Sequence, residues 1–353
     1  IDDALVASII NALTPTFADY RAYITNTADL VIIATPQGTL PELRAERVLQ
    51  GFIGDDLKHQ GIDSAAQLQL RQIADGRLLR AYGTLFGTRA NSYYYPRLSL
   101  DAPQTRFTSS TASYLIDLNT PVPATAGLLP EALGIRQALP ATTTPSPLRS
   151  FQGEMNTHDA RSYAELLRTG HLAATAAQRL DPPLLSTTYL LWQAARQACH
   201  RQDDGTAVEI LARNLRSAVN LTLMTLPPEL HQGVLIDPAW LPCAPEAVSA
   251  DFADILRLNA ALAARDWSGA HALGEAWLGK ADANQVWKAQ FDDIALAAVL
   301  LDHARNGQWQ ALQAAEKRLS PAMTARNGQS YRLIRLLLAM ADNEQAAARE
   351  TVK

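Results

Sequence analysis

The sequence has few cysteines, no long apolar run and no strong excess of one charge, and each of these excludes a class of protein. Only two of the 353 residues are cysteines, Cys199 and Cys243, and neither has a zinc-ligand spacing, which predicts two thiols in a reducing compartment. The longest apolar stretch, 294–301, is far shorter than the roughly 20 residues that cross a membrane. With 31 Lys and Arg against 35 Asp and Glu, bulk positive charge cannot attract nucleic acid.

Motifs for catalysis and cofactor binding are also missing. No two glycines are separated by a single residue, so no glycine-rich cofactor loop is predicted, and no pair of the seven histidines has a metal-ligand spacing. The adjacent carboxylates at 55–56, 203–204 and 292–293 point apart on a helix or strand, which predicts helix caps or solvated faces. We therefore assign no catalytic residue, no metal ligand and no cofactor to this chain.

Composition divides the chain into three zones. Hydrophobic residues make up 48% and charged residues 19%, which is typical of soluble globular proteins with more than one domain. Six of the 19 prolines fall between Pro121 and Pro147, and all six tryptophans come later. We predict an α+β domain over 1–107, a Pro/Thr-rich linker over 108–157 and an all-α domain over 158–353.

Periodicity and cap residues locate the elements of the first zone and the linker. The apolar, β-branched run at 29–34 predicts a strand that is buried on both faces. Two other strands and four helices follow from the same reasoning. The strands are expected at 20–24 and 98–100, and the helices at 3–13, 40–49, 64–73 (with Asp63 or Ser64 as the cap) and 130–139.

The last zone shows a weak internal repeat. Helices predicted at 252–264 and 287–304 are each followed by a short turn with a tryptophan, and Trp267 and Trp309 are 42 residues apart. A third helix at 331–340 would open another hairpin at Asp342. This pattern is similar to tetratricopeptide-like helical hairpins, and a generic helical bundle is an equally good interpretation.

Read together, three motifs in the first 107 residues resemble the C-terminal end of the spermidine synthase-like (polyamine aminopropyltransferase) family. Residues 6–13, 17–20 and 29–34 are similar to the family's late helix and its "F-x-x-v" and "D-l-v-l-v-A" strands. Gly61-Ile-Asp-Ser64 with Leu68 is similar to "G-I-x-S-x-x-x-L". Residues 91–98 followed by Ala102-Pro103 are similar to "N-T-D-D-x-P-x-L" and "A-P". The chain looks most like the branch in which this domain is fused to membrane segments.

The resemblance implies that the first zone forms the edge of a methyltransferase-like sheet, and that the family's cofactor loop and catalytic aspartates lie upstream of Ile1. Tyr93 and Tyr94 stand where the family motif has two acids. The expected partner is then the missing N-terminal half or another protein chain. A polyamine or sulfonium substrate would bind only to the completed domain. The expected location is cytoplasmic, with any membrane attachment through an upstream segment.

An unusual aromatic cluster gives the only candidate for substrate binding. Tyr93, Tyr94 and Tyr95 precede Pro96 and could form a wall for the aliphatic, cationic body of a polyamine. The alternative is a β-rich stretch that packs between the two domains. Likewise, Trp267 and Trp309 could line a groove for a partner helix or anchor the packing of the hairpins.

Two functions of different classes remain open. The chain is either the C-terminal portion of an aminopropyltransferase in polyamine biosynthesis, with a helical tail for interaction or regulation, or a non-catalytic helical-repeat scaffold with a degenerate remnant of that family. Alone, the chain is expected to be inactive, because it holds no acid that we can assign to deprotonating an amine.

Overall fold

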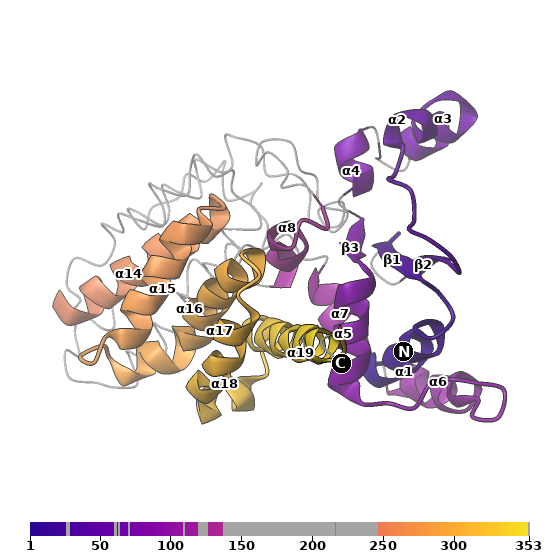
Figure 1. The fold of residues 1–353 in the computed structure, drawn as a ribbon. Coiled ribbons are helices and arrows are strands. Elements are labelled where there is room, and N and C mark those ends of the chain that lie inside the picture. Colours follow the sequence, from indigo (N-terminus) through magenta and orange to yellow (C-terminus); the bar gives the residue numbers. More distant parts are fainter. Residues whose placement is uncertain are drawn as a thin grey trace.

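The computed structural model describes residues 1–136, 216 and 246–351, apart from gaps at 26–28, 60–61, 63, 70, 109 and 119–125 (Figure 1). This part of the chain is mostly helical, with a small antiparallel sheet near the N-terminus. The coarse prediction of an α+β part followed by helices is confirmed. Most of the predicted linker and both cysteines lie outside the described residues.

The sheet has three strands, with β1 (Asp19–Ile24) between β2 (Leu30–Thr35) and β3 (Gln72–Ala74). Both pairings are antiparallel, and Ala22 lies opposite Ile32 on one side and Ala74 on the other. The strand predicted at 20–24 is confirmed. The helix predicted up to residue 73 is wrong at its end, because pairing with β1 turns residues 72–74 into a strand with Ile73 fully buried.

Among the described residues, helices cover one face of this sheet. On that face Tyr20, Ala22 and Ile24 of β1 are buried. On the other face Val31 and Ile33 of β2 remain 42% and 49% exposed. The prediction that 29–34 is buried on both faces is therefore wrong, because β2 is an edge strand and the apolar run has helices on one side only.

Two capped helices pack on the covered face. The side chain of Asp2 accepts from the Leu5 amide at 2.8 Å and starts α1 (Asp3–Leu13), whose predicted bounds are confirmed. Helix α5 (Gly76–Phe86) was not predicted, although Asp75 caps it in the same way, with 2.9 Å to the Leu78 amide. The two helices cross at Gly83, where a Cβ atom would clash with the Asn11 side chain.

The first 136 residues also form several short helices besides the sheet, α1 and α5. They are α2 (Ala45–Val48), α3 (Gly51–His59), α4 (Ala65–Gln69), α6 (Arg97–Phe107), α7 (Ser113–Leu118), the 3-10 turn η1 (Ala126–Leu128) and α8 (Leu129–Ala132). The helix predicted at 40–49 is shorter, because the Leu40 amide donates to Asp19 and its carbonyl accepts from Arg21, which hold that residue outside the helix. The helix expected at 130–139 is observed over 129–132.

The strand predicted at 98–100 is wrong, since these residues belong to α6. The side chain of Asn91 accepts from the Leu98 amide at 3.0 Å, which stabilises the start of this helix. Arg97 and Asp101 then form an ion pair at 3.2 Å one turn apart. The helix continues through Pro103. These local interactions outweigh the extended conformation expected next to proline.

Helices flank both tryptophan-containing turns, as predicted, and the kinship of these helix pairs to a repeat family stays a prediction. Helix α14 (Glu246–Ala263) turns into α15 (Trp267–Gly279), and α16 (Gln285–Arg305) turns into α17 (Trp309–Ala314) (Figure 1). Trp267 and Trp309 begin the second helices and pack, partly buried, against the core, as the packing interpretation expects. Helix α15 lies so close to α16 that a Cβ atom on Gly274 would be 2.7 Å from the Ala295 carbonyl oxygen.

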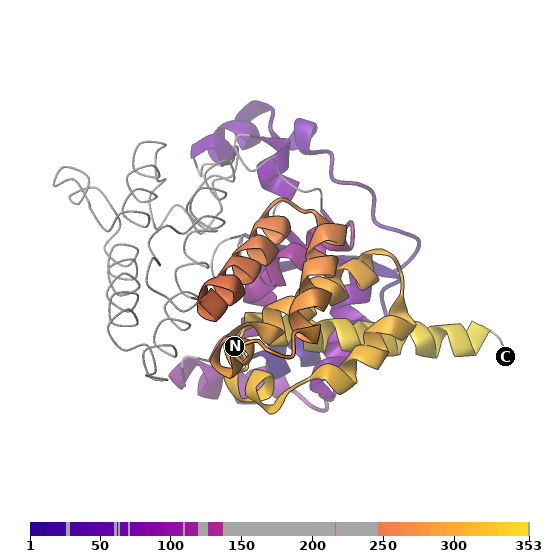
Figure 2. The ribbon, with the colours of Figure 1, turned by 90° about the vertical axis from the view of Figure 1, so that its left-hand side faces the viewer.

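The last helix joins the two parts of the molecule. After the 3-10 turn η4 (Ala315–Arg318) and α18 (Pro321–Arg326), α19 runs over Gln329–Thr351 and packs along α5 (Figures 1 and 2). The hairpin expected at Asp342 is wrong, because the sequence after Met340 has no glycine or proline to end the helix. One continuous set of buried residues runs from α1 to α19.

Candidate functional site

The tyrosine cluster lies on the surface. Tyr93 and Tyr94 are 92% and 85% exposed, and their rings meet edge to face at 5.7 Å. Ser92 and Tyr95 exchange two backbone hydrogen bonds, which fold these residues into a tight turn before α6. This exposure contradicts the alternative in which Tyr93 and Tyr94 pack between domains.

The third tyrosine of the cluster has a cationic neighbour. The guanidinium carbon of Arg89 lies 3.2 Å above the centre of the Tyr95 ring, which is a cation–π contact. A polyamine would therefore find the Tyr95 face occupied and would contact Tyr93 and Tyr94 from the solvent side only. The role of the three tyrosines in substrate binding stays a prediction.

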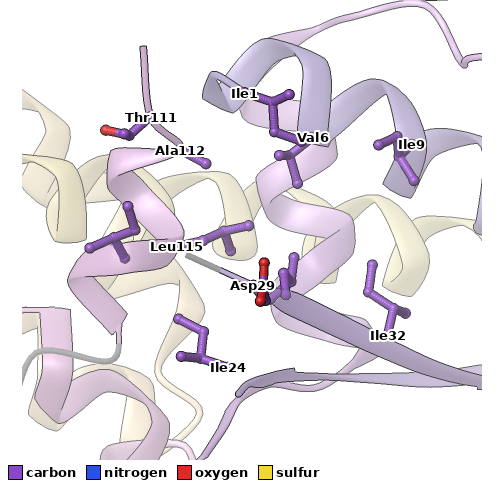
Figure 3. Close-up of a pocket in the computed structure, with 11 residues that line it drawn as sticks. Ile1, Val6, Ile9, Ile24, Asp29, Ile32, Thr111, Ala112 and Leu115 are labelled. Atoms are coloured by element: carbon purple, nitrogen blue, oxygen red, sulfur yellow. The ribbon is translucent and has the colours of Figure 1, made fainter. Parts of the chain in front are cut away.

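A cavity of about 470 Å³ lies between the β1–β2 hairpin and two helices (Figure 3). Such volumes are typical of small-molecule sites, which span roughly 300–1,000 Å³. The walls are mostly aliphatic side chains from α1, β1, β2 and α7. The lining residues are Ile1, Val6, Ile9, Ile24, Asp29, Leu30, Ile32, Thr111, Ala112, Leu115 and Ile116.

Of the described residues in this lining, Asp29 is the one with an ionisable side chain, and Thr111 adds a hydroxyl group. In the view of Figure 3, the Asp29 carboxylate lies among the aliphatic side chains that converge from the helices and strands. Asp29 is exposed and directly precedes β2. From the sequence, Asp29 was interpreted only as the start of a strand. The one feature that could have indicated a binding site is an acid directly before an apolar run.

A second acid, Asp3, lies at the junction of α1, α5 and α7. Its Oδ1 accepts from the Tyr82 hydroxyl at 2.9 Å and from the Tyr114 amide at 3.2 Å. Burial raises the pKa of Asp3, and these hydrogen bonds only partly oppose the effect. Burial, together with the charge of Asp3, also raises the pKa of Tyr82. This acid therefore ties helices together and does not face the cavity lining.

In the carboxylate pair at 292–293, Asp292 is partly buried and Asp293 is fully buried, which corrects the prediction of a solvated face. Asp293 is fully buried and binds both nitrogens of Arg216 at 2.9 Å, with Arg326 at 3.2 Å. Asp292 accepts from the Trp277 indole at 2.8 Å, and burial raises its pKa. The prediction failed because partners from other helices surround α16.

The prediction of a solvated carboxylate pair holds at 55–56, where Asp55 is exposed and pairs with Lys58. The pair at 203–204 lies outside the described residues.

Two histidines meet on the outer side of the helical hairpins. His271 Nδ1 lies 2.9 Å from Asp302, and the rings of His271 and His303 are 4.9 Å apart. Nearby, Arg318 binds Glu275 through two contacts of 2.7 and 2.8 Å, and these hydrogen bonds lower the pKa of Glu275. These polar interactions link α15 to α16 and η4 to α15.

Within the described residues, no group of three or more His, Cys, Asp or Glu side chains is arranged to hold a metal ion, and no helix has the length and apolarity to span a bilayer. Comparisons of the chain with protein-family models, with curated proteins and with solved structures find no match. Function is therefore argued from the residues and their geometry.

Proposed function

We propose that this chain is the C-terminal portion of a spermidine synthase-like aminopropyltransferase, whose cofactor-binding and catalytic half lies outside these 353 residues. The order of elements supports this assignment. Helix α1 is followed by the adjacent antiparallel strands β1 and β2, in the order in which the resemblance expects a late helix and two closing strands.

The main support is the uncovered side of the sheet. Natural edge strands are usually protected by charges, prolines or bulges, and β2, with the sequence LVIIAT, has none of these. Within the described residues, no strand pairs with its outer edge. Val31 and Ile33 also expose apolar surface on the open face. Such a strand fits the edge at which the rest of a larger sheet would continue.

The open face is covered only at one end. Arg21, opposite Ile33 in the β1–β2 pairing, donates to the Leu40 carbonyl at 3.0 Å and pairs with Glu42 at 3.2 Å. Towards the other end, Tyr23 and Val31 face each other, and Val31 is exposed. The proposed catalytic half would then contact the surface around Val31 and Ile33.

Expressing this chain with the coding sequence upstream of Ile1 tests the proposal. The longer protein is expected to form spermidine from putrescine and decarboxylated S-adenosylmethionine, measured by chromatography, while the 353-residue chain is inactive. The double variant Val31→Asp/Ile33→Asp should lower this activity by at least tenfold. Phe107→Asp is the matched control, because Phe107 is 90% exposed on α6 and remote in sequence from β2.

The proposal would be overturned if the longer protein bound neither substrate at millimolar concentration in calorimetry. It would also be overturned if the β2 variant and the Phe107 variant behaved alike in an active enzyme.

A helical scaffold for protein interaction is the second candidate. The α14–α15 and α16–α17 hairpins pack in sequence order, with α15 against α16, as stacked hairpins do in repeat proteins. In this case the longer protein would show no transfer, and a bound protein would be displaced by substitutions on the hairpins rather than on β2.

A further inference from the structure

We propose that the cavity between α1, α7 and the β1–β2 hairpin binds a primary alkylammonium ion, with the alkyl chain inside and the ammonium group at Asp29. This site is separate from the tyrosine cluster, and the inference does not rest on the proposed function.

The walls fit a saturated carbon chain. Helix α1 contributes Val6 and Ile9, the strands contribute Ile24 and Ile32, and α7 contributes Leu115. Within the described part of the chain no aromatic residue lines the cavity, so neither stacking nor cation–π contacts from it would favour a ring or a buried cation. Transfer of a methylene group from water into such a space is favourable, so each carbon added to the ligand's chain should strengthen its binding.

The charge of the lining selects the head group. Among the lining residues that the structure describes, Asp29 is the one ionisable side chain, and none is Lys, Arg or His. An alkylammonium ion can place its charge beside this carboxylate while its tail stays in the cavity, whereas a carboxylate head group would be repelled. Because Asp29 is exposed, solvent screens the attraction, and we expect a preference of several-fold rather than of orders of magnitude.

The same geometry disfavours a polyamine. Putrescine and spermidine carry further ammonium groups a few carbons along the chain. These groups would enter the aliphatic part of the cavity, where no second carboxylate is present in the lining. Burying an unpaired charge is costly, whereas burying methylene groups is favourable. The site therefore discriminates in favour of one terminal amine.

Titration calorimetry on the full 353-residue chain at pH 7 tests the ligand class. The probes are n-octylammonium, 1-octanol, sodium octanoate and putrescine. We expect n-octylammonium to bind several-fold more tightly than octanol, octanoate to bind most weakly, and putrescine to give no saturable heat. When octylammonium is added, the methyl NMR signals of Ile9, Ile24 and Ile32 should shift, and the shifts should reach a plateau at high ligand concentration.

Two variants separate the tail from the head group. Ala112→Leu adds bulk to the cavity wall and should weaken both octylammonium and octanol at least tenfold. Asp29→Asn should reduce octylammonium binding to the octanol level and leave octanol unchanged. Asp55→Asn, an exposed acid on α3, is the matched control and should change nothing.

The inference is overturned if octylammonium does not bind the wild-type chain, or if the charged and neutral probes bind equally. It is also overturned if Ala112→Leu leaves octylammonium binding intact. None of these outcomes depends on aminopropyl transfer, which is measured on the longer protein, so the two proposals fail independently.

Discussion

The Asp3 carboxylate shows how a single buried group couples stability to pH. Its pKa is raised by burial above the unfolded value of 3.8, so the folded state binds this proton more tightly. As pH rises through the folded pKa, the carboxylate becomes charged in a partly desolvated place and stability falls. Below 3.8 both states are protonated and this cost disappears.

Asp3→Asn should remove this pH dependence. The amide Oδ1 can still accept from Tyr82 and from the Tyr114 amide. We expect the variant to gain up to about 1 kcal/mol in the free energy of unfolding at pH 7, because solvent contact limits the effect. The gain should shrink as pH falls towards 3.8 in urea unfolding. A gain that grew on acidification would contradict the assignment.

The ion pair between Asp117 and Arg332 makes a second residue-level prediction. The Arg332 guanidinium lies 2.6 Å from the nearly buried Asp117 carboxylate and links α19 to α7. Removing the arginine leaves a buried charge without its partner, so Arg332→Met should cost about 3–5 kcal/mol in the free energy of unfolding.

The matched test is the double variant Arg332→Met/Asp117→Asn. Neutralising the acid should restore much of the lost stability, because the penalty comes from the unpaired charge. A double variant as unstable as Arg332→Met would show that packing of the arginine, rather than its charge, holds this contact.

At the scale of elements, the contact between α15 and α16 depends on one missing side chain. A Cβ atom at Gly274 would lie 2.7 Å from the backbone oxygen of Ala295 and 3.1 Å from Val299. Gly274→Ala should therefore lower the free energy of unfolding by about 1–3 kcal/mol, because the helices must separate. Thermal unfolding of the purified chain measures this effect.

Gly279, at the end of the same helix, is the control. Nothing lies within 4 Å of a Cβ atom built there, so Gly279→Ala should be neutral or stabilising by up to about 1 kcal/mol. Equal losses at the two positions would point to backbone conformation rather than to the close approach.

Elements were predictable where their signals are local. Helix α1 has a cap at Asp2 and apolar side chains on one face, and its bounds were read correctly from the sequence. Strand β3 and helix α6 were missed, because pairing with β1 defines the first and contacts of the Asn91 and Arg97 side chains support the second. Which face of β2 is open depends on helices elsewhere in the chain.

The cavity lay beyond sequence reasoning for the same reason. Its walls come from separate segments, at 1–9, 24–32 and 111–116, that meet only after folding. The tyrosine cluster was identified as an unusual run, whereas its exposure is a property of the folded chain. Local patterns thus indicate which elements form, and long-range packing decides which of their residues meet.

At the scale of the whole molecule, the continuous core predicts cooperative unfolding. Four tryptophans lie in described helices of this part, so their fluorescence reports it; they are Trp267, Trp277, Trp287 and Trp309. Hydrogen exchange of the Ala22 amide in β1 reports the sheet. Because α19 packs along α5, we expect both probes to give the same unfolding free energy within about 1 kcal/mol. Clearly separate values would show that the sheet and the helices unfold independently.

The pairing of α5 with α19 has a consequence for synthesis of the protein. Thr84 and Asn343, which meet across this contact, are 259 residues apart. While the ribosome is still making the middle of the chain, the surface of α5 that α19 covers has no partner. Helix α5 therefore reaches its final packing only after α19 has been translated, and a chaperone that shields α5 during that interval would raise the yield of native protein.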